Sequence, residues 1–109
     1  MRFPLNGTAS GKAVLAVLDD AEAQAALSRF SREVADGLRR EIAEIRRTGI
    51  AFDRDEHTPG IAAAAIAQRA VGDNVIAISV PAPTERFLDE EQHIISALRA
   101  AADSPAWTR

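Results

Sequence analysis

Apolar residues recur at helical spacing in two segments near the start of the chain. A helix is predicted over residues 8–18, where Thr8 is a suitable N-cap and larger apolar side chains gather on one face. A second helix is predicted from Asp19 to about Phe30, because Asp19 and Glu22 have the spacing of a capping box. The first part of the chain is therefore expected to be helical.

The same periodicity predicts a third helix in the middle of the chain and a fourth near its end. We expect the third helix to begin after an N-cap at Asp36 and to end at Gly49, because glycine is favoured just after a helix. Its narrow apolar stripe consists of Leu38, Ile42 and Ile45. The fourth helix is expected over residues 88–102, with an acidic first turn.

Three strands are predicted between these two longer helices. Residues 50–54 alternate weakly, residues 60–67 form a continuous run of small apolar side chains, and residues 75–80 have the composition of a strand. The continuous run is also compatible with a buried helix, because periodicity alone does not separate the two.

A hairpin is expected between the last two of these strands. The segment Gly72-Asp73-Asn74 has the chemistry of a hairpin turn, and Pro81 and Pro83 are expected to end the last strand. Together the elements predict an α+β domain with an antiparallel sheet.

Composition limits the classes of function. The 109 residues suit one domain, and 47% of them are apolar, as in a globular protein. A net charge of −3 argues against a stand-alone nucleic-acid binder. The chain has no cysteine and no apolar run of membrane-spanning length. We expect a cytoplasmic protein with no cofactor.

The segment "GTASGK" is similar to a phosphate-binding loop but departs from that motif. Gly7 and Gly11 are separated by three residues instead of four, and Lys12 is not followed by Ser or Thr. The amides of Ala9, Ser10 and Gly11 would still lie in a first helical turn, where an anion can approach the backbone. An ordinary helix start is the alternative.

Four ionisable residues lie close together before Gly60: Asp53, Asp55, Glu56 and His57. Carboxylates and histidine are metal ligands, but consecutive strand residues point to opposite faces, so these groups do not all converge. We interpret the cluster as a charged strand end and turn, without a metal site. No base accompanies Ser79, which argues against a nucleophilic serine.

Four arginines lie on the third helix: Arg39, Arg40, Arg46 and Arg47. We expect Glu44 to pair with Arg40, and Glu41 more loosely with Arg47, along an exposed face. The arginines therefore predict a salt-bridged surface instead of a nucleic-acid site.

Three blocks of the sequence, taken in order, resemble one family. They are "PLNGTASGKAVLAVL", "LRREIAEIRRTGIAFDRDEHTPGIAAAAI" and "VIAISVPAPTERF". Their order and spacing are similar to those of the ligand-binding domain of IclR-type bacterial transcriptional regulators, from about Pro4 to about Ala102. The middle block is the most specific of the three.

The resemblance implies a GAF-like α+β fold that binds small organic acids or aromatic catabolites. It also implies that residues 1–109 are a partial effector-binding domain that lacks the family's first strands and its winged-helix DNA-binding domain. We therefore expect no direct binding of nucleic acid. Since absent strands would leave a sheet edge unpaired, we expect a homodimer or a higher oligomer.

The resemblance also implies a binding pocket. Backbone amides at the start of the first helix would hold the effector's carboxylate, at Ala9, Ser10 and the neighbouring Gly11. The family's polar pocket residue falls on Asp53, and its apolar wall falls on Ile61 and Ala63. Of two alternating hydroxyls on the last strand, one is Ser79 and the other is replaced by Pro81, which cannot donate a hydrogen bond.

Two other classes of function stay open at this point. One is a truncated module that only oligomerises, without a ligand. The other is a small hydrolase or a metal-dependent enzyme, for which the residues give little support.

Overall fold

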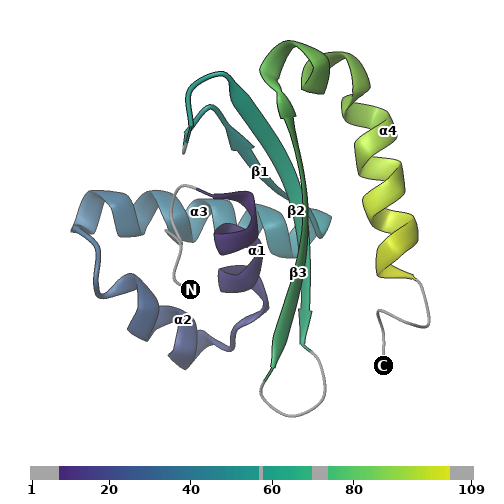
Figure 1. Cartoon of the computed structure of the whole chain (residues 1–109). Coiled ribbons are helices and arrows are strands. Elements are labelled where there is room, and N and C mark those ends of the chain that lie inside the picture. Colours follow the sequence, from purple (N-terminus) through teal and green to yellow (C-terminus); the bar gives the residue numbers. More distant parts are fainter. Residues whose placement is uncertain (1–7, 57, 70–73, 104–109) are drawn as a thin grey trace.

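The fold has three layers, with a sheet between two sets of helices (Figure 1). The computed structural model describes residues 8–56, 58–69 and 74–103. Its elements are α1 (Ala9–Val17), α2 (Asp20–Leu27), α3 (Arg32–Thr48), β1 (Ala51–Arg54), β2 (Ile61–Arg69), β3 (Val75–Pro83) and α4 (Thr84–Ala102). The strands are antiparallel in the order β1-β2-β3. The predicted α+β class is therefore confirmed.

The first two helices begin where the capping residues predict. The Thr8 hydroxyl accepts a hydrogen bond from the Gly11 amide, and Asp19 and Glu22 form a reciprocal capping box. α2 ends at Leu27, earlier than the expected Phe30.

The expected start of the third helix was wrong. α3 begins at Arg32, because the Ser31 hydroxyl accepts a hydrogen bond from the Val34 amide and caps the helix there. Asp36 lies within the first two turns, and Gly37 is tolerated inside the helix. The end of α3 at Gly49 is as predicted, with Gly49 at φ 85° in the left-handed region.

The fourth helix also begins before its predicted start. α4 begins at Thr84, directly after Pro83 at the N-cap position. The acidic residue of its first turn is therefore Glu85, and the acidic run at 89–91 lies further along the helix. Ile94 and Leu98 face inward and are buried.

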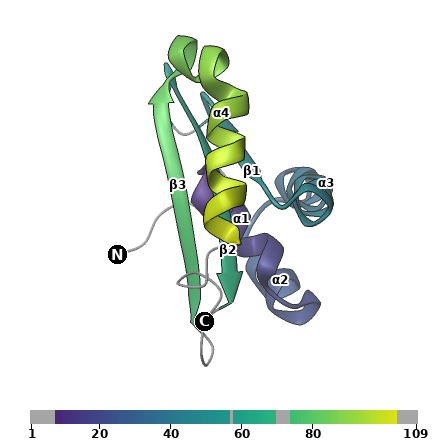
Figure 2. The same cartoon turned by 90° about the vertical axis from the view of Figure 1, so that its right-hand side faces the viewer.

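The central strand β2 is buried on both faces, which is why its sequence is continuously apolar. On one face its alanines pack with α1 and α3, and on the other face they pack with α4. Figure 2 shows α4 running along the sheet, with β3 at the outer edge of the molecule. Small side chains let the helices approach the sheet closely on both faces.

The last strand runs through Pro81 and ends only at Pro83, which corrects the expected end at residue 80. β3 continues through Pro81 to Pro83 and pairs with β2 along its length, from Ile61 opposite Pro83 to Arg69 opposite Val75. Proline is tolerated because β3 lies at the edge of the described sheet, where its missing N–H faces away from β2. The antiparallel pairing itself is as expected. Gly72 and Asp73 of the predicted turn lie outside the described residues.

Three arginines of α3 form ion pairs, namely Arg39, Arg46 and Arg47, and the pairs that the spacing predicts do not form. Glu44 pairs with Arg47 and not Arg40, while Glu41 pairs with Lys12 and not Arg47. The Arg47 guanidinium beside Glu44 lowers the pKa of that exposed carboxyl. This face of α3 is therefore a network of surface ion pairs.

Replacing either of two glycines by alanine should change the free energy of unfolding, in opposite directions. Gly37 lies inside α3, and Gly49 directly follows it. Gly49→Ala should lower the free energy of unfolding by about 1–2 kcal/mol, because alanine is strained in the left-handed conformation. Gly37→Ala should raise it by about 0.5–1 kcal/mol, since alanine favours a helix interior. The nearest atom to an added Cβ at Gly37 is Arg40 Nη2, at 3.9 Å. Urea unfolding checks both, and equal effects of the two changes would contradict this description of α3.

Candidate functional site

The start of α1 presents backbone amides that the helix itself does not use. The amides of Gly11 and Lys12 donate to the side chain and the carbonyl of Thr8. The amides of Ala9 and Ser10 precede them in the first turn, where a helix supplies no carbonyl partner. Ala9 is buried and Ser10 is half-buried. Three amides were predicted to bind an anion. The Gly11 amide already donates a hydrogen bond to Thr8, so the Ala9 and Ser10 amides are the two that a ligand could use.

The predicted sheet residues all lie on the face that α1 covers. The strand register aligns Asp53 with Ala63 and Pro81 in one row across the sheet. Ser79 and Ile61 lie two residues to either side of this row along their strands, so that their side chains share this face. Ala63 is buried, Ile61 is half-buried, and Ser79 and Pro81 are exposed. Sequence positions 53, 61, 63, 79 and 81 thus meet on one surface beside α1.

The acidic cluster before Gly60 is a structured turn. Asp53 is buried and its Oδ1 accepts a hydrogen bond from the Glu56 amide at 2.9 Å. Asp55 adopts φ 64°, and its Oδ1 accepts from the Gly60 amide at 2.8 Å and from the Thr84 hydroxyl at 2.6 Å. His57 lies outside the described residues. Within the part of the chain that the structure describes, no three acidic or histidine side chains converge on a metal position.

Lys12 is a buried cationic residue next to this surface. Its side chain is 1% exposed, and its ammonium lies 2.6 Å from Glu56 Oε1, 3.0 Å from the Phe52 carbonyl oxygen and 3.1 Å from Glu41 Oε1. These partners come from the β1–β2 turn, β1 and α3, so one ammonium joins three segments to α1. The two carboxylates are about half exposed, which leaves the cation as the desolvated member.

In the sequence, Lys12 drew attention only as part of a segment that departs from the phosphate-binding loop motif. A signal was present, because Lys12 is the one lysine of the chain and lies at helical spacing from Leu15 and Ala16, which are buried. A lone lysine on an apolar stripe predicts a buried ion pair. The partners themselves are 29 to 44 residues away along the chain, beyond the reach of local patterns.

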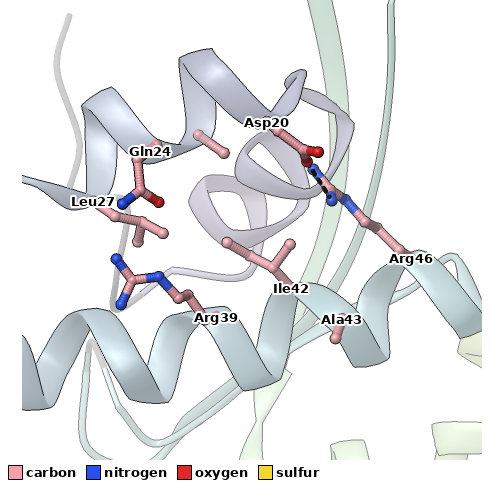
Figure 3. Close-up of a pocket in the computed structure, with 8 residues that line it drawn as sticks. Asp20, Gln24, Leu27, Arg39, Ile42, Ala43 and Arg46 are labelled. Atoms are coloured by element: carbon pink, nitrogen blue, oxygen red, sulfur yellow. Dashed lines mark hydrogen bonds and ion pairs between the residues drawn. The ribbon is translucent and has the colours of Figure 1, made fainter.

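A cavity of about 230 Å³ lies between α2 and α3, away from the predicted surface. Figure 3 shows Gln24 and Leu27 facing Arg39 and Ile42 across it, with Arg46 at the other end. Arg46 binds Asp20 and the carbonyl oxygens of Ala16 and Leu18, while Arg39 binds Asp36. The charges around this cavity therefore already neutralise one another.

Comparison with known proteins identifies the class. Residues 1–107 match the family described as bacterial transcriptional regulator IclR, C-terminal. The chain therefore belongs to the IclR family, as its C-terminal effector-binding domain, in agreement with the resemblance found in the sequence. This is a family of regulators and not of enzymes.

Individual relatives agree with this assignment. The chain is 40% identical to the HTH-type transcriptional regulator Rv1719 of Mycobacterium tuberculosis, over 90% of this chain and 40% of the relative. The C-terminal domain of a transcriptional regulator from Vibrio cholerae is 33% identical, with a TM-score of 0.78 over 92% of this chain and 62% of that one. The C-terminal domain of E. coli KdgR is 27% identical, with a TM-score of 0.77 over 94% and 68%.

The chain spans less than half the length of the Mycobacterium tuberculosis relative and of another solved structure. The Thermotoga maritima IclR structure is 26% identical with a TM-score of 0.79, and the match covers 94% of this chain and 46% of that chain.

None of the described helices is both long and apolar enough to cross a membrane.

Removing the Lys12 charge should destabilise the fold. Lys12→Met keeps most of the side-chain volume but leaves the Phe52 carbonyl without its donor, which should lower the free energy of unfolding by about 1–3 kcal/mol. The exposed Arg47→Met change, which also removes an ion pair, is the matched control and should have far less effect. Urea unfolding measures both. Equal stabilities of Lys12→Met and the unchanged protein would show that Lys12 does not hold the segments together.

Proposed function

We propose that this chain senses a small monocarboxylic acid as the effector domain of a cytoplasmic transcriptional regulator. The ligand would lie between the amino end of α1 and the α1-facing surface of β2 and β3. The observation that supports the proposal is that α1, with the Ala9 and Ser10 amides in its first turn, packs on the face of the sheet to which Asp53, Ala63 and Ser79 belong. DNA binding would belong to a separate domain of such a regulator.

The amino end of α1 supplies the group that binds the carboxylate. The Ala9 and Ser10 amides are two donors at the positive end of the helix dipole, and the small side chains there let an anion approach the backbone. Thr8 already satisfies the next two amides, which fixes the orientation of the first turn. A carboxylate at this point would therefore complete the capping of the helix.

The sheet would supply the remaining contacts. Ile61 and Ala63 give a small apolar wall, as is usual in pockets for small molecules. The exposed Ser79 hydroxyl can donate one hydrogen bond to the ligand.

Asp53 would select the type of acid. Its carboxylate lies in the same row as Ala63, so it can accept a hydrogen bond from a hydroxyl on the ligand. Its negative charge would repel a second carboxylate at that end. Monoacids that carry a hydroxyl should therefore bind more tightly than diacids.

Pro81 would make the binding weak. It occupies the row of Asp53 and Ala63 at a position where a hydroxyl would provide another donor. A hydrogen bond to a charged group contributes about 1.5–3 kcal/mol, so its absence should cost roughly tenfold to a hundredfold in affinity.

Calorimetry across keto acids, hydroxy acids, aromatic acids and diacids tests the proposal. Binding of a monoacid should weaken roughly tenfold to a hundredfold in Ser10→Pro, which removes one amide donor but is tolerated in a first helical turn. Ser10→Ala keeps the amide and should bind like the unchanged protein. This pair separates the backbone donor from the side chain.

Two results would refute the pocket assignment. One is that no acid binds at millimolar concentration. The other is that Ser10→Pro, shown by circular dichroism to be folded, binds as tightly as Ser10→Ala.

A further inference from the structure

The Lys12 ammonium binds the chain on both sides of Asp53. It donates to the Phe52 carbonyl oxygen at 3.0 Å, and Phe52 directly precedes Asp53 in β1. It also lies 2.6 Å from Glu56 Oε1, in the turn after β1. The backbone amide of Glu56 in turn donates to Asp53 Oδ1 at 2.9 Å. The Asp53 backbone and carboxylate are therefore both held by groups that Lys12 binds.

Glu56 connects the ammonium to the Asp53 carboxylate. Its side chain accepts from Lys12 and its backbone amide donates to Asp53, so that one residue makes both contacts. The ammonium and Asp53 are both buried, whereas the Glu56 carboxylate is partly exposed. Because the ammonium is shielded from water, losing a protein acceptor costs it more than it would at the surface. The contact with Glu56 therefore restrains the turn.

Lys12 is also fixed relative to the start of α1. It follows Ala9 and Ser10 in the same helix, and its own amide donates to the Thr8 carbonyl oxygen at 3.1 Å. Residues within one helical turn have nearly constant relative positions. A single side chain thus connects the amides proposed to hold a carboxylate with the carboxylate proposed to recognise a hydroxyl.

We propose that Lys12 and Glu56 are positioning residues that set the selectivity for the effector. They fix the separation between the Ala9 and Ser10 amides and the Asp53 carboxylate. That separation determines how far from its carboxylate an acid must carry a hydroxyl. The inference rests on the proposed function, because it requires both ends of the site to contact one ligand.

This role affects discrimination between acids more than affinity for acids in general. An acid with its hydroxyl at the matching separation gains one hydrogen bond to Asp53, and its positional isomers do not. Without the Glu56 side chain, the turn that orients Asp53 loses its contact with α1, so this preference is lost. The amides of α1 remain and continue to bind the carboxylate.

Calorimetry with pentanoate and its 2-, 3- and 4-hydroxy derivatives tests the inference. In the unchanged chain, one hydroxy isomer should bind roughly tenfold more tightly than pentanoate, the value of one hydrogen bond to a charged group. In Glu56→Ala this ratio should fall to about one, while the dissociation constant of pentanoate changes by less than about twofold.

Three further variants separate positioning from other effects. Glu44→Ala also removes a carboxylate, that of the surface pair with Arg47, and should keep the preference. Glu56→Gln retains an acceptor oxygen for Lys12 and should keep most of it. Ser10→Pro should weaken all four acids by a similar factor and leave the ratio unchanged. Circular dichroism checks that each variant is folded.

Amide hydrogen exchange tests the positioning without a ligand. In Lys12→Met, the Glu56 amide should exchange about tenfold faster, because the turn that presents it to Asp53 is no longer held. The Gly60 amide donates to Asp55 Oδ1 at 2.8 Å in the same turn and is the internal reference. It should change far less, whereas a general loss of stability would accelerate both amides alike.

The outcomes distinguish this inference from the proposed function. If no acid binds the unchanged chain, the proposed function fails and the inference falls with it. If acids bind and Ser10→Pro weakens them, the carboxylate site stands. The inference alone is then overturned by a hydroxyl preference that is absent from the unchanged chain, or one that Glu56→Ala keeps. Equal acceleration of the Glu56 and Gly60 amides in Lys12→Met would also overturn it.

Discussion

The position of α1 over the sheet depends on one buried ammonium group. Lys12 is almost wholly removed from solvent, and a buried charge is tolerated only when it is paired and hydrogen-bonded. Its three acceptors lie on α3, on β1 and in the turn after β1, so α1 cannot shift without breaking contacts to all of them. Because Ala9 and Ser10 lie in the turn of α1 directly before Lys12, the same interaction fixes where the free helix amides lie.

The interface between α1 and β2 is rich in alanine, which explains why polar contacts are needed to hold α1 in place. Alanines let α1 approach β2 closely, but each contact buries little apolar area. The other end of α1 is held in a similar way, because Arg46 donates to the Ala16 and Leu18 carbonyls and Arg69 donates to the Val17 carbonyl. These arginines satisfy carbonyls that a helix end leaves unpaired. α1 is thus held by cations at both ends, between α3 and the sheet.

Local rules predicted most of the elements and the face on which the site residues lie. The caps at Thr8 and Asp19, the stop at Gly49 and the alternation of strand residues depend on neighbours within a few positions, so they can be read from the sequence. The start of α3 was missed because Asp36 and Ser31 are both good caps, and the sequence alone does not rank them. The last strand was expected to end before Pro81, but it continues to Pro83. A strand tolerates proline at the edge of a sheet, and which strand lies at the edge depends on the whole sheet.

The effector site could be predicted only in part. The strand periodicity and the family resemblance placed Asp53, Ala63 and Ser79 on one surface, and the register of the sheet agrees with that. Neither could show that Lys12 joins distant segments. That feature depends on contacts between residues that are brought together only by the tertiary fold.

The central claim is that the amides at the start of α1 bind the carboxylate of an effector. The most direct measurement is an NMR titration of the labelled chain with a monoacid, following each backbone amide. The account predicts that the largest shift changes occur at Ala9 and Ser10, with smaller changes at Ser79. Changes concentrated at Gln24 and Arg39, in the cavity between α2 and α3, would contradict it, as would a saturating acid that leaves the Ala9 and Ser10 amides unmoved.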